Sequence, residues 1–324
     1  MNNIKKIGLF GFGTVGQGFY EVLQKARLPV ELSKVCVKRL DLERINHPVY
    51  FTTDASELLD DPAIDIIIEL IDDSVAAKKI VESALLSGKH VISANKKMIA
   101  DSLDEVDYWH KEFDPTFLYE AAVGGGIPIV HLVDGYYRNH EVISIRGILN
   151  GSSNYILTQM QNKKWSYDQA VVEAQKLGFA ESNPALDVTG ADASSKLAIL
   201  AYHAFGKVVS MKSCELESIE EVSESDIRAT LKNGDKIKPV ATIMRTNNEV
   251  TCAVKPQKVS ANDPIFSVDY EDNVIDVETE LGGHHIAVGK GAGAIPTGSA
   301  VLEDLKRVLC GYKYQVGNVL EKVA

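Results

Sequence analysis

The sequence predicts an α/β protein of two domains, the first of which is built on a doubly wound parallel sheet. Its 324 residues exceed one typical domain, and a hydrophobic content of 45% is ample for two cores. In the first 130 residues, short apolar segments with strand character alternate with amphipathic helical segments. The later residues mix helices with strands of alternating polarity, so we expect a second domain of the α+β class.

The overall charge narrows the classes of partner. The formal net charge is −11, so the field of the protein repels nucleic acids and anionic membrane surfaces. No apolar run has the length of a membrane span, and the N-terminus lacks the pattern of a secretory signal. The four cysteines are scattered without a CxxC motif, and we expect them to be reduced thiols of a cytoplasmic protein: Cys36, Cys214, Cys252 and Cys310.

The first element is a strand at residues 7–10, followed by a glycine turn and a helix with an apolar face. Gly11, Gly13 and Gly16 form a GxGxxG motif around Thr14 and Val15. The first glycine permits a tight turn, the second lets a pyrophosphate approach the backbone, and the third lets the helix pack on the strand. Because the motif stands in strand–turn–helix context, it predicts a Rossmann-type dinucleotide site at these five residues.

The second strand, residues 33–39, ends in two basic residues. An NAD site usually has an acidic residue at this position to bind the ribose hydroxyls, whereas Lys38 and Arg39 stand here. Basic groups suit a 2′-phosphate, which favours NADP over NAD. The alternative is that each is a solvated surface cation.

The alternation then continues through a short helix at 56–61, a buried strand at 64–71, a helix at 75–88 and a strand at 89–94. Lys96 follows the last of these strands at its carboxyl end, the edge at which ligands bind in open α/β sheets. We expect Lys96, rather than Lys97, to contact a cofactor or substrate. The alternative is a lysine at a helix start that faces water.

A triple glycine follows the next predicted strand. That strand carries Glu120 into the loop Ala121–Gly126, and a helix opens around Pro128. Inward-facing carbonyls beside a carboxylate can bind a hard cation through oxygen. The residues alone favour the other interpretation, a tight strand-to-helix turn.

The second half contains two clear helices joined by a loop. The first, residues 166–178, has a capping box of Ser166 and Gln169 and ends at Gly178. Glu181 lies on the loop, Pro184 prevents early resumption of a helix, and Asp187 follows within the same connection. The next helix begins after Gly190 and covers residues 191–206.

Asp192 and Lys196 lie one turn apart at the start of this helix. The rest of the helix consists of Ala, Leu and Ile, which belong in a core, so we expect Lys196 to be partly buried and held charged by Asp192. Such a lysine is suited to donate a proton. The residues alone support equally an ordinary surface ion pair.

The last part of the chain includes strand-like segments at 250–268 and 273–280, a glycine-rich loop, and a helix at 298–309. We expect a nucleotide-binding domain at residues 1–130 and a substrate-binding, catalytic and dimerisation domain at 131–285. Residues 286–324 are expected to return to the nucleotide-binding domain.

One long segment resembles a known family. "AQKLGFAESNPALDVTGADASSK" is similar to the signature of homoserine dehydrogenases, and every spacing from Ala174 to Lys196 matches. The resemblance extends over essentially the whole chain, through "GFGTVG", "SANKKMIA", "YEAAVGGGIPI", "GILNGSSNYI" and "GKGAGAIPTGSAVLEDL".

The resemblance implies roles for individual residues. The lysine matching Lys196 donates a proton to the aldehyde oxygen, and Asp192 positions it and helps to hold the substrate. Glu181 and Asp187 hold the substrate, near the backbone of Gly151 and Ser152. Lys96 contacts the nicotinamide end of the cofactor and is needed for catalysis. Two further sets are implied: the cofactor contacts Gly178 and Gly293, and a sodium site at Glu120, Val123, Gly125 and Ile127.

The implied activity is the NAD(P)H-dependent interconversion of L-aspartate 4-semialdehyde and L-homoserine, in threonine, methionine and isoleucine biosynthesis, by a homodimer. Two departures matter. Asp72 and Asp73 replace a glycine-rich turn and weaken the preference for NADP. The chain also ends at Ala324, without room for the C-terminal regulatory domain of many relatives, so we expect no threonine feedback through such a domain.

Two other functions compete with this interpretation. An aspartate-semialdehyde dehydrogenase of the same fold needs a nucleophilic cysteine, and none of the four lies beside a base in the sequence. A non-catalytic nucleotide sensor on the same scaffold would have no need of Lys96, Asp192 and Lys196.

Overall fold

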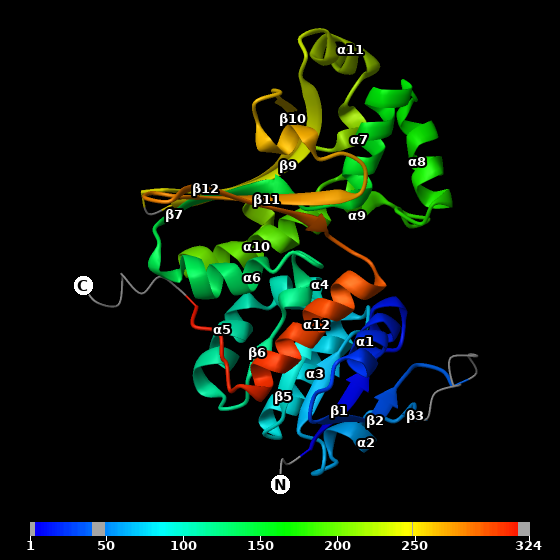
Figure 1. Cartoon of the computed structure of the whole chain (residues 1–324), viewed down its shortest axis with the longest axis vertical. Helices are drawn as coiled ribbons and strands as arrows, with labels where there is room; N and C mark the ends of the chain where they lie inside the picture. Colours follow the sequence, from blue (N-terminus) through cyan, green and yellow to red (C-terminus); the bar gives the residue numbers. More distant parts are fainter. Residues whose placement is uncertain (1–3, 41–48, 248, 317–324) are drawn as a thin grey trace. The chain divides into compact units, whose positions relative to one another are not determined.

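A computed structural model of the chain describes residues 4–40, 49–247 and 249–316. It divides into two compact units. Figure 1 labels their helices and strands and colours them along the sequence. The first unit combines Met1–Pro128 with Ala292–Gln315, and the main segment of the second is Ile129–Gly291. The chain therefore passes into the second unit after Pro128 and returns to the first at Ala292.

The first unit is built on a six-stranded sheet in which every neighbouring pair is parallel. The strand order is β3-β2-β1-β4-β5-β6, so the order reverses between β1 and β4. The bounds are β1 Lys5–Phe10, β2 Val30–Cys36, β3 Tyr50–Thr52, β4 Ile66–Glu69, β5 His90–Ser93 and β6 Phe117–Leu118. This is the doubly wound order, and it confirms the predicted fold class.

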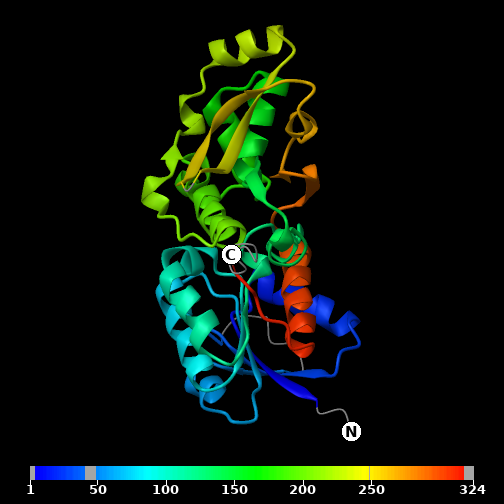
Figure 2. The same cartoon turned by 90° about the vertical axis from the view of Figure 1, so that its left-hand side faces the viewer.

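Helices cover both faces of this sheet. Figure 2 shows α1 and α12 on one face and α3, α4 and α5 on the other. Their bounds are α1 Thr14–Lys25, α2 Ser56–Leu59, α3 Ser74–Leu86, α4 Lys96–Asp101, α5 Leu103–Glu112 and α12 Ala294–Leu309. Because both faces are covered, the central strands are buried on both sides, and all four residues of β4 are buried.

The packing of α1 on α12 depends on glycine. A Cβ at Gly18 would collide with the carbonyl oxygen of Ala294, and a Cβ at Gly298 would come within 2.5 Å of the Phe19 nitrogen. The two helix backbones therefore touch directly, although they come from opposite ends of the sequence.

The second unit is built on a mixed six-stranded sheet of order β12-β11-β7-β9-β10-β8. All pairs are antiparallel except β8 and β10, which run parallel. The bounds are β7 Val142–Ile148, β8 Glu215–Leu216, β9 Lys236–Thr246, β10 Glu249–Val259, β11 Asp272–Thr279 and β12 Gly283–Lys290. The predicted α+β class of this part is confirmed.

Helix α10 is the central helix of the second unit. It contacts β7, β9 and β10, and every residue from Ala193 to Phe205 is buried, as its apolar composition predicts. Helices α7 and α8 pack against each other nearby.

The helix bounds are α6 Ile129–His131, α7 Gly151–Lys163, α8 Tyr167–Lys176, α9 Ala185–Val188, α10 Ala191–Phe205 and α11 Glu224–Lys232. Shorter helical turns are η2 Glu120–Ala122, η3 Leu132–Tyr136, η4 Tyr137–Asn139, η5 Met211–Ser213, η6 Ile219–Glu221 and η7 Pro264–Ser267. Among the described residues, no helix has both the length and the apolar character to cross a membrane.

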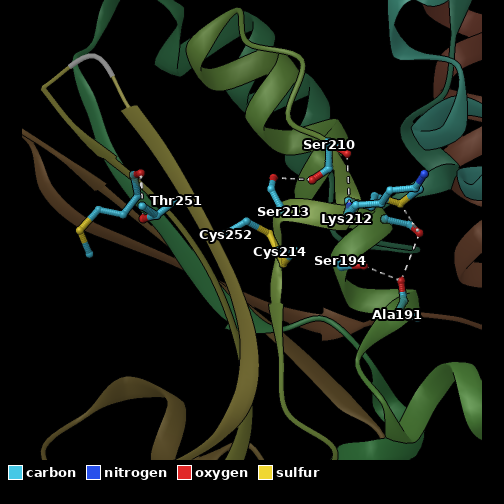
Figure 3. The surroundings of a disulfide bond; sticks show 11 residues. Ala191, Ser194, Ser210, Lys212, Ser213, Cys214, Thr251 and Cys252 are labelled. Carbon is cyan, nitrogen blue, oxygen red and sulfur yellow. Dashed lines mark hydrogen bonds between the residues drawn. A yellow bond between two sulfur atoms is a disulfide. The ribbon is translucent and has the colours of Figure 1, made fainter.

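The prediction of four reduced thiols is wrong for two of them. Cys214 and Cys252 form a disulfide with a Cα–Cα distance of 4.6 Å. Figure 3 shows it joining the end of η5 to β10. The neighbouring residues Glu215 and Ala253 are partners in the parallel β8–β10 pairing. The two cysteines are 38 residues apart in sequence, and the β8–β10 pairing, which the sequence did not predict, brings them together.

Two local predictions also differ from the structure. The strand expected to carry Glu120 ends at Leu118, and Glu120 opens the 3-10 turn η2 instead. Asp187, expected in the loop between two helices, lies on the one-turn helix α9, of which Pro184 is the N-cap. Proline is compatible with a helix start because the first N–H groups have no intrahelical acceptor, so Pro184 begins this helix rather than delaying the next.

Candidate active site

The glycine turn after β1 has the geometry that a dinucleotide requires. Gly11 has a φ of +90°, and a Cβ there would lie 2.5 Å from the Leu70 carbonyl oxygen. A Cβ at Gly16 would collide with the Gly11 carbonyl oxygen, whereas one at Gly13 would meet nothing within 4 Å. Thr14 and Val15 open α1, and the free space at Gly13 lies at its N-cap, where backbone N–H groups bind phosphate.

The two basic residues predicted to favour the 2′-phosphate of NADP lie just after β2. Lys38 and Arg39 are both exposed. The charge of Lys38 helps to lower the pKa of Asp73, although hydrogen bonding from the Ala76 N–H is the largest cause. Asp73 accepts hydrogen bonds from the N–H groups of Val75 and Ala76 and so caps α3. Asp73, which stands where relatives often have a glycine-rich turn, therefore caps α3 and is attracted to Lys38.

A buried carboxyl group organises the carboxyl edge of the sheet. Glu69, at the end of β4, accepts hydrogen bonds from the Ile71 N–H at 2.7 Å and from Ser93 Oγ at 2.5 Å. Ser93 Oγ in turn accepts from the Asn95 N–H at 3.0 Å. Burial raises the pKa of Glu69 to about 7, against the opposing effect of these hydrogen bonds.

This network determines where Lys96 stands. The Asn95 amide donates to the Ile71 carbonyl oxygen at 2.9 Å and accepts from the Met98 N–H at 3.0 Å, which makes it the N-cap of α4. Lys96 is the first residue of that helix and is half-buried. Lys97 is exposed and forms a 2.6 Å ion pair with Asp101. Of the two lysines, the buried network holds Lys96 at the sheet edge.

The triple-glycine loop is buried except at Gly126 and is rich in oxygen donors. Glu120, Val123 and Ile127 are 1–2% exposed, and Gly125 has a φ of +57°. The Glu120 N–H donates to a carboxylate oxygen of Asp304 on α12 at 2.9 Å. Main-chain carbonyls beside buried carboxyl groups are a donor set that fits a hard cation.

The ion pair of Asp192 and Lys196 is buried, which rules out the surface alternative. Their Oδ2–Nζ distance is 2.9 Å, and their side chains are 10% and 9% exposed. Lys196 Nζ also donates to the Leu149 carbonyl oxygen at 2.5 Å. Two oxygen acceptors thus orient an ammonium group inside the second unit, as a proton donor requires.

A second carboxylate lies beside this pair, held by an asparagine. Asn150 Nδ2 donates to Asp187 Oδ1 at 2.7 Å and to Asp192 Oδ2 at 3.0 Å. Burial raises the pKa of Asp187; the Asn150 hydrogen bond opposes that shift, and the charge of Asp192 adds to it. Asp187 and Asn150 also line a pocket together with Gly190, Glu217 and Lys255.

The other predicted site residues of the second unit lie on the flanking loops. Gly151 opens α7, and Ser152 Oγ donates to the Phe179 carbonyl oxygen. Gly178, with a φ of +77°, follows the C-cap of α8. Glu181 is exposed on the loop beyond it. The structure thus brings Asp187, Asp192 and Lys196 together and leaves Glu181 on the exposed loop.

The last predicted cofactor contact belongs to the first unit. Gly293 has a φ of +117° and is the N-cap of α12.

The free cysteines do not support a thiol nucleophile. Burial raises the pKa of Cys36 to about 11, with smaller contributions from Asp54 and Glu57, so its reactive thiolate is scarce. Cys214 and Cys252 are bonded to each other, and Cys310 is exposed at the C-cap of α12.

Sequence reasoning missed Asn150 and Glu69 as members of the site. Each carried a signal: Asn150 stands between a strand and a helix at an N-cap position, and Glu69 ends a run of three isoleucines. The bonds that give them their roles reach 24 to 42 residues along the chain, beyond any local pattern.

Comparisons with known proteins point to one family. A family model for homoserine dehydrogenase matches residues 128–305, and one for the homoserine dehydrogenase NAD-binding domain matches residues 11–111. A homoserine dehydrogenase of Bacillus subtilis is 34% identical over 94% of this chain and 72% of its own length.

Solved structures match as well. The crystal structure of a homoserine dehydrogenase from Thiobacillus denitrificans has a TM-score of 0.90 and 34% identity, covering 94% of this chain and 73% of its own. A hyperthermophilic archaeal homoserine dehydrogenase in complex with NADPH has a TM-score of 0.81 and 26% identity, covering 96% of this chain and 99% of its own. Sequence, fold and site together establish that this chain belongs to the homoserine dehydrogenase family.

Proposed function

We propose that this chain catalyses the NAD(P)-dependent interconversion of L-aspartate 4-semialdehyde and L-homoserine. The observation that carries the proposal is the buried Lys196 ammonium, 2.9 Å from Asp192 and accompanied by a second carboxylate, Asp187. An aldehyde oxygen gains negative charge during reduction, and a substrate amino acid carries a positive ammonium group. One oriented cation and adjacent carboxylates match these two needs.

Each residue then has a distinct task. Lys196 donates its proton to the carbonyl oxygen during reduction and recovers one during oxidation. Asp192 orients Lys196 and contributes to substrate binding. Asp187 and Glu181 bind the substrate's ammonium group, and the backbone of Gly151 and Ser152 lies against the substrate. When bound, the nicotinamide cofactor supplies or accepts the hydride.

The first unit holds the cofactor in this proposal. The turn with Gly11, Gly13 and Gly16 binds the pyrophosphate, with Thr14 and Val15 at the helix N-terminus that faces it. Lys96 contacts the nicotinamide end, and Gly293 makes a further contact. Gly178, which belongs to the second unit, is proposed as one more cofactor contact. Lys38 and Arg39 favour NADP over NAD, because a 2′-phosphate gains from nearby cations.

A cation and a second copy of the chain complete the proposal. The main-chain carbonyls of Val123, Gly125 and Ile127, with Glu120, would hold sodium. A homodimer is supported by strand β12, which exposes Ile286 and Val288 at the edge of its sheet. We assign nucleotide binding to residues 1–130, substrate binding and dimerisation to the unit that includes residues 131–285 and β12, and a return to the nucleotide-binding domain to the later part of residues 286–324. The proposed setting is cytoplasmic synthesis of threonine, methionine and isoleucine.

The test is the absorbance of reduced nicotinamide when the protein is mixed with homoserine and either NAD or NADP at alkaline pH. We expect homoserine-dependent reduction, which Lys196→Ala lowers by about 100-fold or more because the proton donor is lost. Lys96→Ala is expected to lower kcat as well, and the matched control Lys97→Ala to leave it unchanged.

Two further experiments with the same assay test the cofactor preference and the sodium site. Lys38→Ala/Arg39→Ala is expected to reduce kcat/KM for NADP and to leave that for NAD nearly unchanged. Replacement of sodium by choline is expected to lower activity. If folded wild-type protein shows no turnover with either cofactor, the proposed function is wrong.

A further inference from the structure

Asn150 has a position that its capping role alone does not explain. It stands between β7 and α7 and is 7% exposed. Its Oδ1 accepts hydrogen bonds from the Ser153 N–H at 2.9 Å and from Ser153 Oγ at 3.0 Å. Because these bonds require the oxygen to face the helix, they determine that the amino group faces away from it.

The amino group then meets two acids at once. Asn150 Nδ2 has two hydrogens, and it donates at 2.7 Å to Asp187 on α9 and at 3.0 Å to Asp192 on α10. One amide therefore joins the starts of three helices. Its two donors are used on the two carboxylates of the proposed site.

Two neighbouring carboxylates repel each other in a buried setting and tend to share a proton. A donor between them reduces that repulsion without adding charge, because each hydrogen bond to a carboxylate favours the ionised form. Asp192 is already committed to Lys196 at 2.9 Å. Asp187 is thereby left as the carboxylate that a cationic substrate group can approach.

We infer that Asn150 is a positioning residue for the reaction: it holds Asp187 and Asp192 side by side as carboxylates, so that one orients Lys196 and the other binds the substrate's ammonium group. This inference rests on the proposed function. If Asn150 only capped α7, another good capping residue at this position would leave KM for homoserine unchanged, because several residues cap helices equally well.

Asn150→Asp separates the two roles. Aspartate has nearly the same shape and caps helices as well as asparagine does, but it replaces the shared donor with a third carboxylate. We expect KM for homoserine to rise roughly tenfold or more while KM for the cofactor stays unchanged. The acid limb of kcat/KM against pH is expected to move to higher pH, because the acids now hold a proton more tightly.

A second pair of variants keeps the test decisive if Asn150→Asp folds poorly. Asn150→Ser retains the cap but is too short to reach both acids, and the same rise in KM is expected. Asn150→Asp/Asp187→Asn exchanges donor and acceptor, and its melting temperature is expected to exceed that of Asn150→Asp. The matched control is Asn162→Asp, the same substitution at an exposed position of the same helix. Its acid limb is expected to match that of the wild type.

The two proposals fail in different ways. If wild-type protein oxidises homoserine but Asn150→Asp and Asn150→Ser retain its KM and its pH profile, the positioning role is overturned and the proposed activity stands. If wild-type protein binds the cofactor but does not oxidise homoserine, the proposed function is wrong, and the role of Asn150 in that reaction is wrong with it.

Discussion

Lys196 places a charged ammonium group within the buried helix α10 of the second unit. Burial of an unpaired ammonium group is costly, and here Asp192 and the Leu149 carbonyl oxygen compensate it. Removal of Asp192 would take away the carboxylate that lies 2.9 Å from Lys196 Nζ and would leave a buried charge without that ion pair. The side chain that performs the proposed chemistry therefore depends on its neighbours for stability as well as for orientation.

Glu69 gives the clearest pH dependence at the residue scale. Its pKa is about 7 in the folded protein against 4.5 for an ordinary glutamate, so the native state binds a proton that the unfolded chain has released. Stability from this group is present in full below about pH 4.5 and is lost as the pH rises through 7. We expect the free energy of unfolding to fall by about 3 kcal/mol over this range through Glu69 alone.

Glu69→Gln is the variant that isolates this effect, because an amide keeps the shape and does not titrate. Urea unfolding at several pH values should give a flatter dependence for the variant than for the wild type. Parallel curves for the two proteins would show that Glu69 ionises normally.

The contact between α1 and α12 requires glycine where the two helix backbones meet. At Gly18 an added methyl would collide with the Ala294 carbonyl oxygen, and backbone cannot rotate away as a side chain can. Gly18→Ala is therefore expected to lower the free energy of unfolding by about 1–3 kcal/mol. Gly135→Ala is the matched control, since a Cβ there meets nothing within 4 Å. Thermal melts of both variants test this, and an unchanged melting temperature for Gly18→Ala would contradict it.

The Cys214–Cys252 disulfide stabilises the second unit by restricting its unfolded chain. For a separation of 38 residues, the entropy of loop closure amounts to about 4 kcal/mol. We expect Cys214→Ser/Cys252→Ser, or treatment of the wild type with a strong reductant, to lower the free energy of unfolding by up to this amount. Cys310→Ser is the control because that thiol is free. Equal stability of the oxidised and reduced wild type would count against the bond's contribution.

At the scale of the whole molecule, local patterns predicted the elements well and their long-range contacts poorly. Apolar runs such as residues 66–68 and the capping box at Ser166 located strands and helices, because these depend on neighbours in sequence. The two-residue strand β6 and the four-residue helix α9 are too short to show a period. The disulfide and the bonds of Asn150 join residues 37 to 42 apart, so they arise only once the chain has folded.

The return of the chain to its first unit has a consequence for the order of folding during synthesis. Residues 129–291 are continuous, whereas the first unit needs α12, which starts at Ala294. The ribosome releases the chain from its N-terminus, so α1 emerges well before its packing partner α12, and residues 129–291 of the second unit are translated in between. A nascent chain that stops before α12 would therefore leave the glycine face of α1 uncovered and accessible to chaperones.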